Sequence, residues 1–94
     1  MKHYIIVKYN DLVADREAFL REATEVFAPV IDIAGVRSVA LHPAVLLGGN
    51  RYDLRILIDM ERESLPAYDA SQAHRLWKES FGKYIAHKVI FDHE

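Results

Sequence analysis

Apolar and polar residues alternate with a period of two in four short segments of the chain, which is the pattern of a β-strand with one buried face. The segments cover residues 2–9, 36–42, 52–60 and 86–93. In the first segment, one face carries His3, Ile5, Val7 and Tyr9. The third segment is the most regular, and its apolar face carries Tyr52, Leu54, Ile56, Ile58 and Met60. The pattern therefore predicts four strands.

Apolar residues recur at helical spacing between the first two of these strands. Asp15 is a suitable N-cap, so we expect a helix from about Arg16. Its inward stripe consists of Phe19, Leu20, Ala23, Val26, Phe27, Val30 and Ile31. Pro29 should kink this helix or end its regular part, because proline has no amide hydrogen to donate. Gly35 then closes the segment.

A second helical region precedes the last strand. Ser64 can cap a short helix whose first turn holds Pro66, and Ser71 can cap a longer helix. The longer helix has an inward stripe that consists of Ala73, Leu76, Trp77, Ser80, Phe81 and Tyr84. We expect Gly82 to weaken the end of this helix.

The predicted order β-α-β-β-α-β is that of the ferredoxin-like α+β fold, with a four-stranded antiparallel sheet and both helices on one face. We expect residues 1–94 to form a single domain, because a chain of 94 residues has enough apolar sequence for one modest core. There is no internal repeat and no linker-like segment.

The second face of the sheet should be too apolar to remain in water. We expect it to carry Tyr4, Ile6, Val39, Leu41, Leu57 and Ile90, beside the charged residues Lys8, Arg55, Asp59 and Lys88. A second copy of the same sheet is the simplest cover for such a face. The sequence thus predicts a homodimer in which two sheets form an α+β barrel.

Composition narrows the function. The net charge of −2 does not favour nucleic acid, which usually requires a basic surface. No segment is long and apolar enough for a membrane helix or a signal peptide, so we expect a cytoplasmic protein. The chain has no cysteine, and its five histidines do not have the spacing of a metal site. We expect neither a metal nor a cofactor.

Four stretches, KHYIIVK, GVRSV, YDLRILIDM and AYDASQAH…IFDH, together resemble the stress-responsive A/B barrel (Dabb) family. The resemblance covers nearly the whole chain with its elements in order. It implies a dimeric α+β barrel with a pocket between the sheet and the helices of each subunit. It also suggests the cofactor-free polyketide cyclisation of the olivetolic acid cyclase type.

The resemblance places three candidate catalytic residues: Tyr68 and His74 match the tyrosine–histidine pair of those cyclases, and His3 matches a first-strand histidine. This chain has Ser71 at the first position of a motif that often reads His-Pro-Ala-His in the family. It also has Leu54 near the position of a further cyclase histidine.

Histidine can accept and return a proton near neutral pH, and a phenol can polarise a carbonyl group. In the catalytic interpretation, His74 is the general base, Tyr68 polarises the carbonyl of a small apolar or polyketide-like compound, and His3 orients it. In the structural interpretation, Tyr68 and His74 are a hydrogen-bonded pair that fixes a helix junction. We expect the pocket to be lined by Ile5, Val7, Phe27, Leu54, Ile56, Trp77 and Phe81.

Two other functions remain open from the sequence. One is a non-catalytic dimer that binds a small molecule or a protein. The other is a cofactor-free oxygenase or isomerase, by analogy of fold alone.

Overall fold

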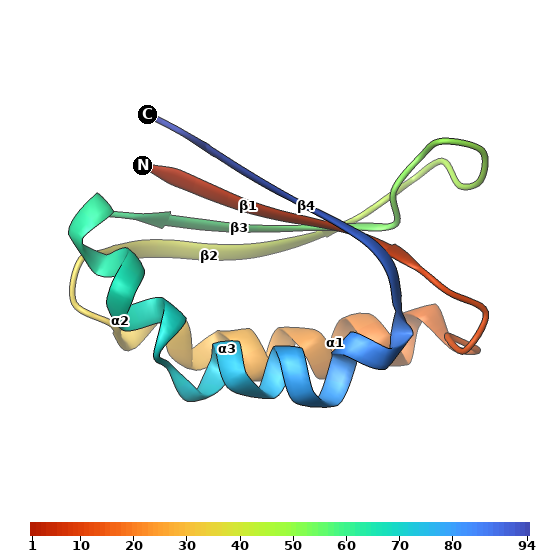
Figure 1. Ribbon diagram of the computed structural model, residues 1–94, viewed down its shortest axis with the longest axis horizontal. Coiled ribbons are helices and arrows are strands. Elements are labelled where there is room, and N and C mark those ends of the chain that lie inside the picture. Colours follow the sequence, from red (N-terminus) through yellow and green to blue (C-terminus); the bar gives the residue numbers. More distant parts are fainter.

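The computed structural model describes residues 1–94 as one antiparallel sheet with all helices on one side of it (Figure 1). The elements are β1 (Lys2–Tyr9), α1 (Arg16–Phe27), β2 (Val36–Pro43), β3 (Leu54–Met60), α2 (Leu65–Asp69), α3 (Gln72–Leu76) and β4 (Ile85–His93). The strands lie in the order β2-β3-β1-β4. This is the predicted ferredoxin-like α+β fold, and the bounds of β1 and the start of α1 agree with the sequence pattern.

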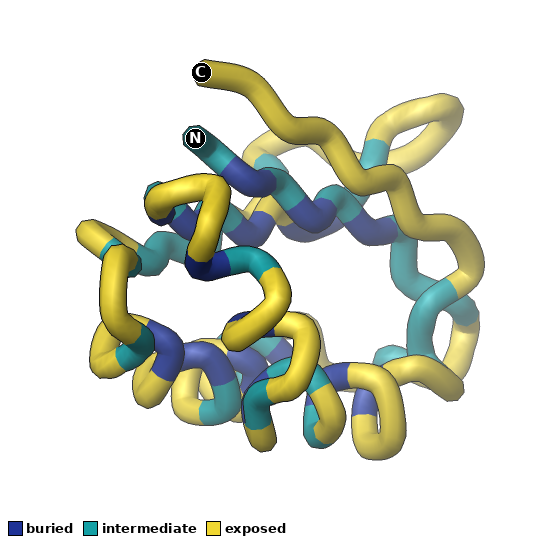
Figure 2. Tube along the Cα trace, turned by 60° about the vertical axis from the view of Figure 1, so that its left-hand side comes forward, coloured by how far each residue is buried: buried dark blue, intermediate teal, exposed yellow.

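The core lies between the two central strands and the helices. Alternate residues of β1 and β3 point into it, and β4 at the edge is exposed along most of its length (Figure 2). The strands contribute Ile5, Val7, Leu54, Ile56, Ile58 and Met60. The helical layer contributes Phe19, Ala23, Phe27, Val30, Tyr68, Ala73, Trp77 and Phe81.

The helix ends follow the predicted caps with one exception. Asp15 accepts a hydrogen bond from the Ala18 amide, and Ser71 accepts one from the His74 amide. Ser64 makes no such bond, so its prediction as a capping side chain is wrong. Its hydroxyl instead donates to the Ala34 carbonyl at 2.7 Å. Gly35 passes beside that hydroxyl with φ +88°, where a β-carbon would lie 2.2 Å from Ser64 Oγ, so glycine is required there.

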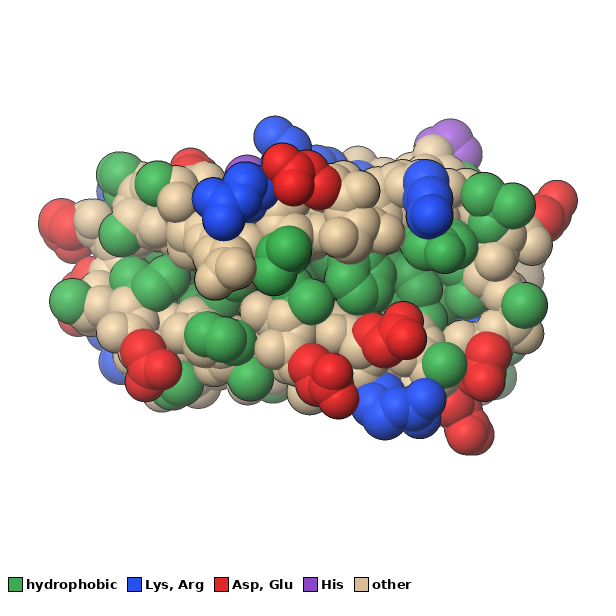
Figure 3. Space-filling view, turned by 90° about the horizontal axis from the view of Figure 1, so that it is seen from below, with side chains coloured by type: hydrophobic (Ala, Val, Ile, Leu, Met, Phe, Trp, Pro, Cys, Tyr) green, Lys and Arg blue, Asp and Glu red, His purple; other side chains and the backbone are tan.

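Both helical regions change their winding near their ends. After α1 the chain continues as a 3₁₀ helix over Ala28–Asp32, which turns Ile31 outward, so its place in the predicted stripe is wrong. After α3 it continues as a π-helical turn over Trp77–Phe81 and a 3₁₀ turn over Gly82–Tyr84. Seen from the helical side, apolar side chains fill the seam between α1 and the α3 region (Figure 3).

The second face of the sheet carries a different set of residues from the one predicted. Strand register places Val39, Leu41, Lys88 and Ile90 on the helical side, because they lie opposite residues that point into the core. The face without helices, called the open face below, is formed by Lys2, Tyr4, Ile6, Lys8, Ser38, Ala40, His42, Arg55, Leu57, Asp59, His87, Val89, Phe91 and His93. It still has an apolar centre, now supplied on the β4 side by Val89 and Phe91.

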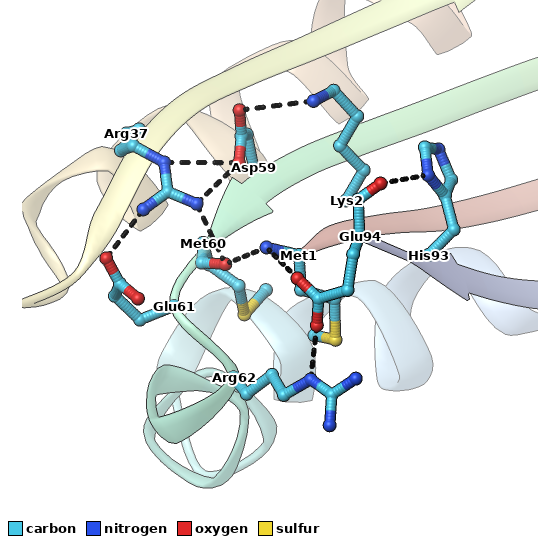
Figure 4. A network of polar contacts seen from close by, with 9 residues as sticks. All are labelled: Met1, Lys2, Arg37, Asp59, Met60, Glu61, Arg62, His93 and Glu94. Carbon is cyan, nitrogen blue, oxygen red and sulfur yellow. Dashed lines mark hydrogen bonds and ion pairs between the residues drawn. The ribbon is translucent and has the colours of Figure 1, made fainter.

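Polar contacts tie together the end of the sheet at which both chain ends lie (Figure 4). Arg37 binds Asp59 at 2.9 Å and Glu61 at 2.7 Å. Lys2 approaches the same Asp59 carboxylate at 3.9 Å. These pairs are largely exposed to solvent, so each contributes little to stability.

At the opposite end of the sheet, one buried carboxylate joins three elements. Asp53, which precedes β3, accepts hydrogen bonds from Arg16 at 2.6 Å and from the Tyr9 amide at 2.8 Å. Burial alone would raise the pKa of Asp53, but the hydrogen bonds from Arg16 and Tyr9 bring it below its ordinary value. The carboxylate form is therefore the one that holds β1, α1 and β3 together.

We expect Asp53→Asn to lower the free energy of unfolding by about 2 kcal/mol, because hydrogen bonds to a charged group are lost in a buried place. Since the folded state lowers the pKa of Asp53, its contribution is present above about pH 4 and is lost as the pH falls. Urea unfolding at a series of pH values should therefore show that the free energy of unfolding falls less between neutral and acid pH in the variant than in the wild type. An equal acid dependence in both proteins would contradict this assignment.

Candidate functional site

A pocket of about 260 Å³ lies between the β1–β4 edge of the sheet and the helices α2 and α3. Its lining combines apolar side chains with several groups that can exchange protons. The lining residues are His3, Ile5, Leu65, Tyr68, Asp69, His74, Trp77, Lys88, Ile90 and Asp92. All three predicted catalytic residues are therefore brought together at one pocket, although they come from β1, α2 and α3.

Tyr68 lies near the end of α2 and is only 1% exposed. Its hydroxyl oxygen is buried and has no hydrogen-bond partner in the protein. A buried hydroxyl without a partner costs roughly 1–3 kcal/mol, so such a group is rare unless it has a role. Burial, with a smaller contribution from the Asp69 charge, raises the pKa of Tyr68 well above its ordinary value. The phenol therefore keeps its proton at neutral pH and can donate a hydrogen bond to an oxygen.

His3 is held by a carboxylate that the sequence analysis did not include. Its Nδ1 lies 2.5 Å from Asp92 Oδ1, across the β1–β4 pairing that sets His3 opposite Asp92. The carboxylate can only accept, so Nδ1 carries a proton, and in the neutral imidazole the lone pair is then on Nε2. The His3 side chain is 7% exposed and Asp92 38%, which leaves Asp92 at the rim of the pocket.

Both histidine rings contact the ring of Tyr68. The His3 and Tyr68 ring centroids are 5.7 Å apart, and those of Tyr68 and His74 are 5.2 Å apart, both edge to face. His74 is half-buried, and its backbone amide donates to Ser71 Oγ at 3.2 Å. No hydrogen bond joins the Tyr68 hydroxyl to His74, so the predicted hydrogen-bonded pair is an aromatic contact instead.

The predicted pocket wall is only partly the observed one. Ile5 and Trp77 line the pocket. Val7, Phe27, Leu54 and Ile56 are buried deep in the core. Phe81 is also buried, and it lines shallow grooves between α1 and the α3 region.

Sequence reasoning missed Asp92, Lys88 and Ile90 because it assigned the wrong face to β4. The strand alternates evenly, so placing Phe91 and Val89 on the open face sends these three residues to the pocket. One feature of the sequence could have indicated Asp92. When the first strand pairs antiparallel with the last so that Lys2 lies opposite His93, Asp92 lies opposite His3. Asp69 and Leu65, from the short helix α2, complete the lining.

The remaining histidines lie elsewhere, on the open face: His42, His87 and His93. No group of three or more histidine, aspartate and glutamate side chains is arranged to hold a metal ion. None of the helices has the length and apolar character needed to cross a membrane.

Two tyrosines should make the fold sensitive to alkali. Burial, together with the Asp53 charge and against that of Arg16, raises the pKa of Tyr9 to about 12, and the pKa of Tyr68 is also raised. An unfolded tyrosine ionises near pH 10, so the stabilisation is complete below that pH and is lost as the pH rises further. We expect the free energy of unfolding to fall above about pH 10, less steeply in Tyr9→Phe. An unchanged slope in this variant would contradict the prediction.

No protein-family model matches the sequence, and no curated protein sequence matches it. Solved structures match closely in fold. A dimeric ferredoxin-like protein of unknown function from Thermobifida fusca superposes with a TM-score of 0.78 at 20% identity, over 96% of this chain and 85% of that one. A Dabb family protein from Mesorhizobium loti gives 0.75 at 11% identity, over 99% and 93%. A provisionally assigned antibiotic biosynthesis monooxygenase from Nitrosomonas europaea gives 0.71 at 15% identity, over 98% and 88%. The chain shares the ferredoxin-like fold of these proteins. The Thermobifida fusca protein and two further similar structures are described as dimeric.

Proposed function

We propose that this chain is a homodimeric protein of the Dabb type that binds a small carbonyl compound in the Tyr68 pocket and moves a proton on it without a cofactor. One observation carries the proposal: a buried phenol without a hydrogen-bond partner contacts two histidine rings at the wall of a pocket. A ligand oxygen that accepts from Tyr68 would supply the hydrogen bond that the fold leaves unmade.

The hydrogen bond to Asp92 makes His3, rather than His74, the better-supported base. Asp92 fixes the tautomer that leaves Nε2 free and stabilises the imidazolium that forms when Nε2 takes a proton. The ring of His74 also contacts Tyr68, so His74 can orient the substrate or return a proton to it. The roles are the reverse of those suggested by the sequence, in which His74 is the base and His3 orients the substrate.

The reaction needs no other reagent. His3 Nε2 removes a proton from the carbon beside the carbonyl, the C–H bond breaks, and its electron pair forms an enolate whose oxygen accepts from Tyr68. In a β,γ-unsaturated carbonyl compound the enolate charge extends to the γ-carbon, and return of the proton to that carbon gives an isomerase. Attack of the enolate carbon on a second carbonyl of the same molecule, which then takes the proton as an alcohol, gives a cyclase.

The second copy would cover the open face. Phe91 is 57% and Val89 43% exposed in the monomer, beside half-buried Tyr4, Ile6 and Leu57. Burying apolar surface yields about 25 cal/mol per Å², so a few hundred Å² contribute several kcal/mol to association. The dimeric state of several proteins of the same fold supports a dimer, although not a particular face.

The test combines binding with proton exchange. A panel of small β-keto, aromatic carbonyl and acyl compounds is screened by thermal shift, and each binder is assayed for deuterium uptake from D₂O beside its carbonyl. We expect His3→Asn to slow the exchange by about 10²–10⁴-fold, the usual contribution of a general base, and to change affinity much less. Glu79→Gln, an exposed residue of the helical layer outside the pocket and off the open face, is the control.

Failure has a clear form. Equal exchange in wild type and His3→Asn would remove His3 as the base. A panel without binders would remove the carbonyl pocket itself.

A second function, binding without chemistry, is favoured by a separate observation. Most exposed large apolar side chains lie outside the pocket, including Phe91 on the open face and Val45, Leu46 and Leu47 in the β2–β3 loop. This chain would then act mainly through association with another surface. Binders that raise the melting temperature but exchange no proton would support this alternative over catalysis.

A further inference from the structure

The open face carries a cation without a counter-charge. Arg55 lies on the central strand β3 and is exposed, with its guanidinium 5.2 Å from the centre of the Tyr4 ring. Its only polar contact is with His42, from Arg55 Nη2 to His42 Nδ1 at 3.4 Å. Both groups are bases, so this contact offers Arg55 no negative charge.

No carboxylate on this face is free to pair with Arg55. Asp59 is the only acidic residue among the open-face strand positions, and Arg37 and Lys2 already bind it (Figure 4). The Lys8 side chain on β1 donates hydrogen bonds from Nζ to the backbone carbonyls of Arg51 at 2.8 Å and Gly49 at 3.3 Å. An arginine with no counter-charge is tolerable in water but costs several kcal/mol once it is buried.

The site around Arg55 suits a ligand that accepts hydrogen bonds rather than one that donates them. It is a depression of about 290 Å³ lined by Tyr4, Ile6, Arg55, Phe91 and His93. His93 Nδ1 donates to the Glu94 carbonyl at 2.8 Å, and its Nε2 lies 3.3 Å from the Tyr4 hydroxyl, so both ring nitrogens already have a partner within the chain. Apart from the contact with His42, the N–H groups of the Arg55 guanidinium remain available to a ligand. Their planar fork matches the oxygens of a carboxylate or a phosphate.

We propose that a small anion, a carboxylate or a phosphate, binds at Arg55 between the two open faces of the dimer. This inference rests on the proposed dimer, because stacking two copies removes Arg55 from water and encloses the site with residues of both. Twofold symmetry brings two such cations into one interface, and the anion supplies the charge that the chain lacks. Tyr4 supports the guanidinium, and Phe91 provides an apolar wall for the rest of the anion.

The experiment measures the dimer dissociation constant by sedimentation velocity at constant ionic strength. Chloride is replaced in one series by inorganic phosphate and in another by benzoate, so that the two sources of the anion are distinguished. We expect at least one of the two anions to tighten the dimer about tenfold or more, the effect of one charge-assisted hydrogen bond. Arg55→Met should lose this response and dimerise in chloride at least as tightly as wild type. Arg75→Met, an exposed arginine on α3, should behave as wild type.

The outcomes separate this inference from the proposed function. A wild-type dimer that responds to neither anion overturns the anion site and leaves the dimer in place. An Arg55→Met dimer that keeps the response, or that is weakened in chloride, also overturns it, since Arg55 would then have a partner in the second copy. A protein that stays monomeric with and without the anions overturns both.

Discussion

Tyr68→Phe is expected to stabilise the free protein and to weaken ligand binding. Phenylalanine fills the same space in the core, and the change removes a buried hydroxyl that has no hydrogen-bond partner. The free energy of unfolding should therefore rise by about 1 kcal/mol. Affinity for a carbonyl ligand should fall about ten- to a hundredfold, since one buried hydrogen bond is lost. Higher stability together with weaker ligand binding would indicate that the Tyr68 hydroxyl serves binding rather than folding.

The two effects are measured by urea unfolding and by calorimetric titration with a compound found in the thermal-shift screen. Tyr84→Phe is the matched control, because Tyr84 is half-buried in the same helical layer and lies outside the pocket. A Tyr68→Phe protein that is less stable than wild type would mean that the hydroxyl has a structural partner. Unchanged affinity would remove Tyr68 from the ligand site.

The strands and the fold class could be predicted from the sequence because their signal is local. Alternation in β1 and β3 is nearly unbroken, and each of these central strands packs one face on the helices. The caps at Asp15 and Ser71 are likewise decided within one helical turn. Ser64 was misassigned because its true partner, the Ala34 carbonyl, lies thirty residues away in the chain.

The faces of β4 could not be read in the same way. Both faces of this edge strand are exposed in the monomer, so burial does not mark one of them as inner. Its orientation is set by pairing with β1, which places Ile90 opposite Ile5 and Phe91 opposite Tyr4. Assigning Ile90 to the open face therefore failed, and with it the recognition of Asp92 as a pocket residue.

The pocket wall could be predicted only in part for a related reason. Periodicity identifies the inward side of a strand or helix but not how deep a residue lies on that side. Ile5 and Val7 share one face of β1, yet Ile5 reaches the pocket while Val7 is covered by the core. Tyr68, His3 and His74 line one pocket, and it was the family resemblance, rather than periodicity, that grouped them in the sequence.

Phe91→Lys is expected to convert the proposed dimer to a folded monomer. Phe91 is 57% exposed in the single chain, so its replacement should leave the free energy of unfolding of the monomer nearly unchanged. In the dimer each interface would lose two phenylalanine side chains, about 2 kcal/mol each, and gain two cations on a face with no free carboxylate. The dissociation constant should rise about a thousandfold or more.

Sedimentation and circular dichroism of Phe91→Lys measure assembly and fold separately. Leu12→Lys is the control, because Leu12 is 61% exposed and lies beside the helical seam, away from the open face. A Phe91→Lys protein that dimerises as wild type would show that the open face is not the interface. Alternation in β4 adds a further expectation: Phe91 faces the partner, while its neighbours Ile90 and Asp92 face the pocket. Releasing this edge strand from a partner should loosen the hold of Asp92 on His3, so the monomeric variant should also bind the carbonyl ligand more weakly than wild type.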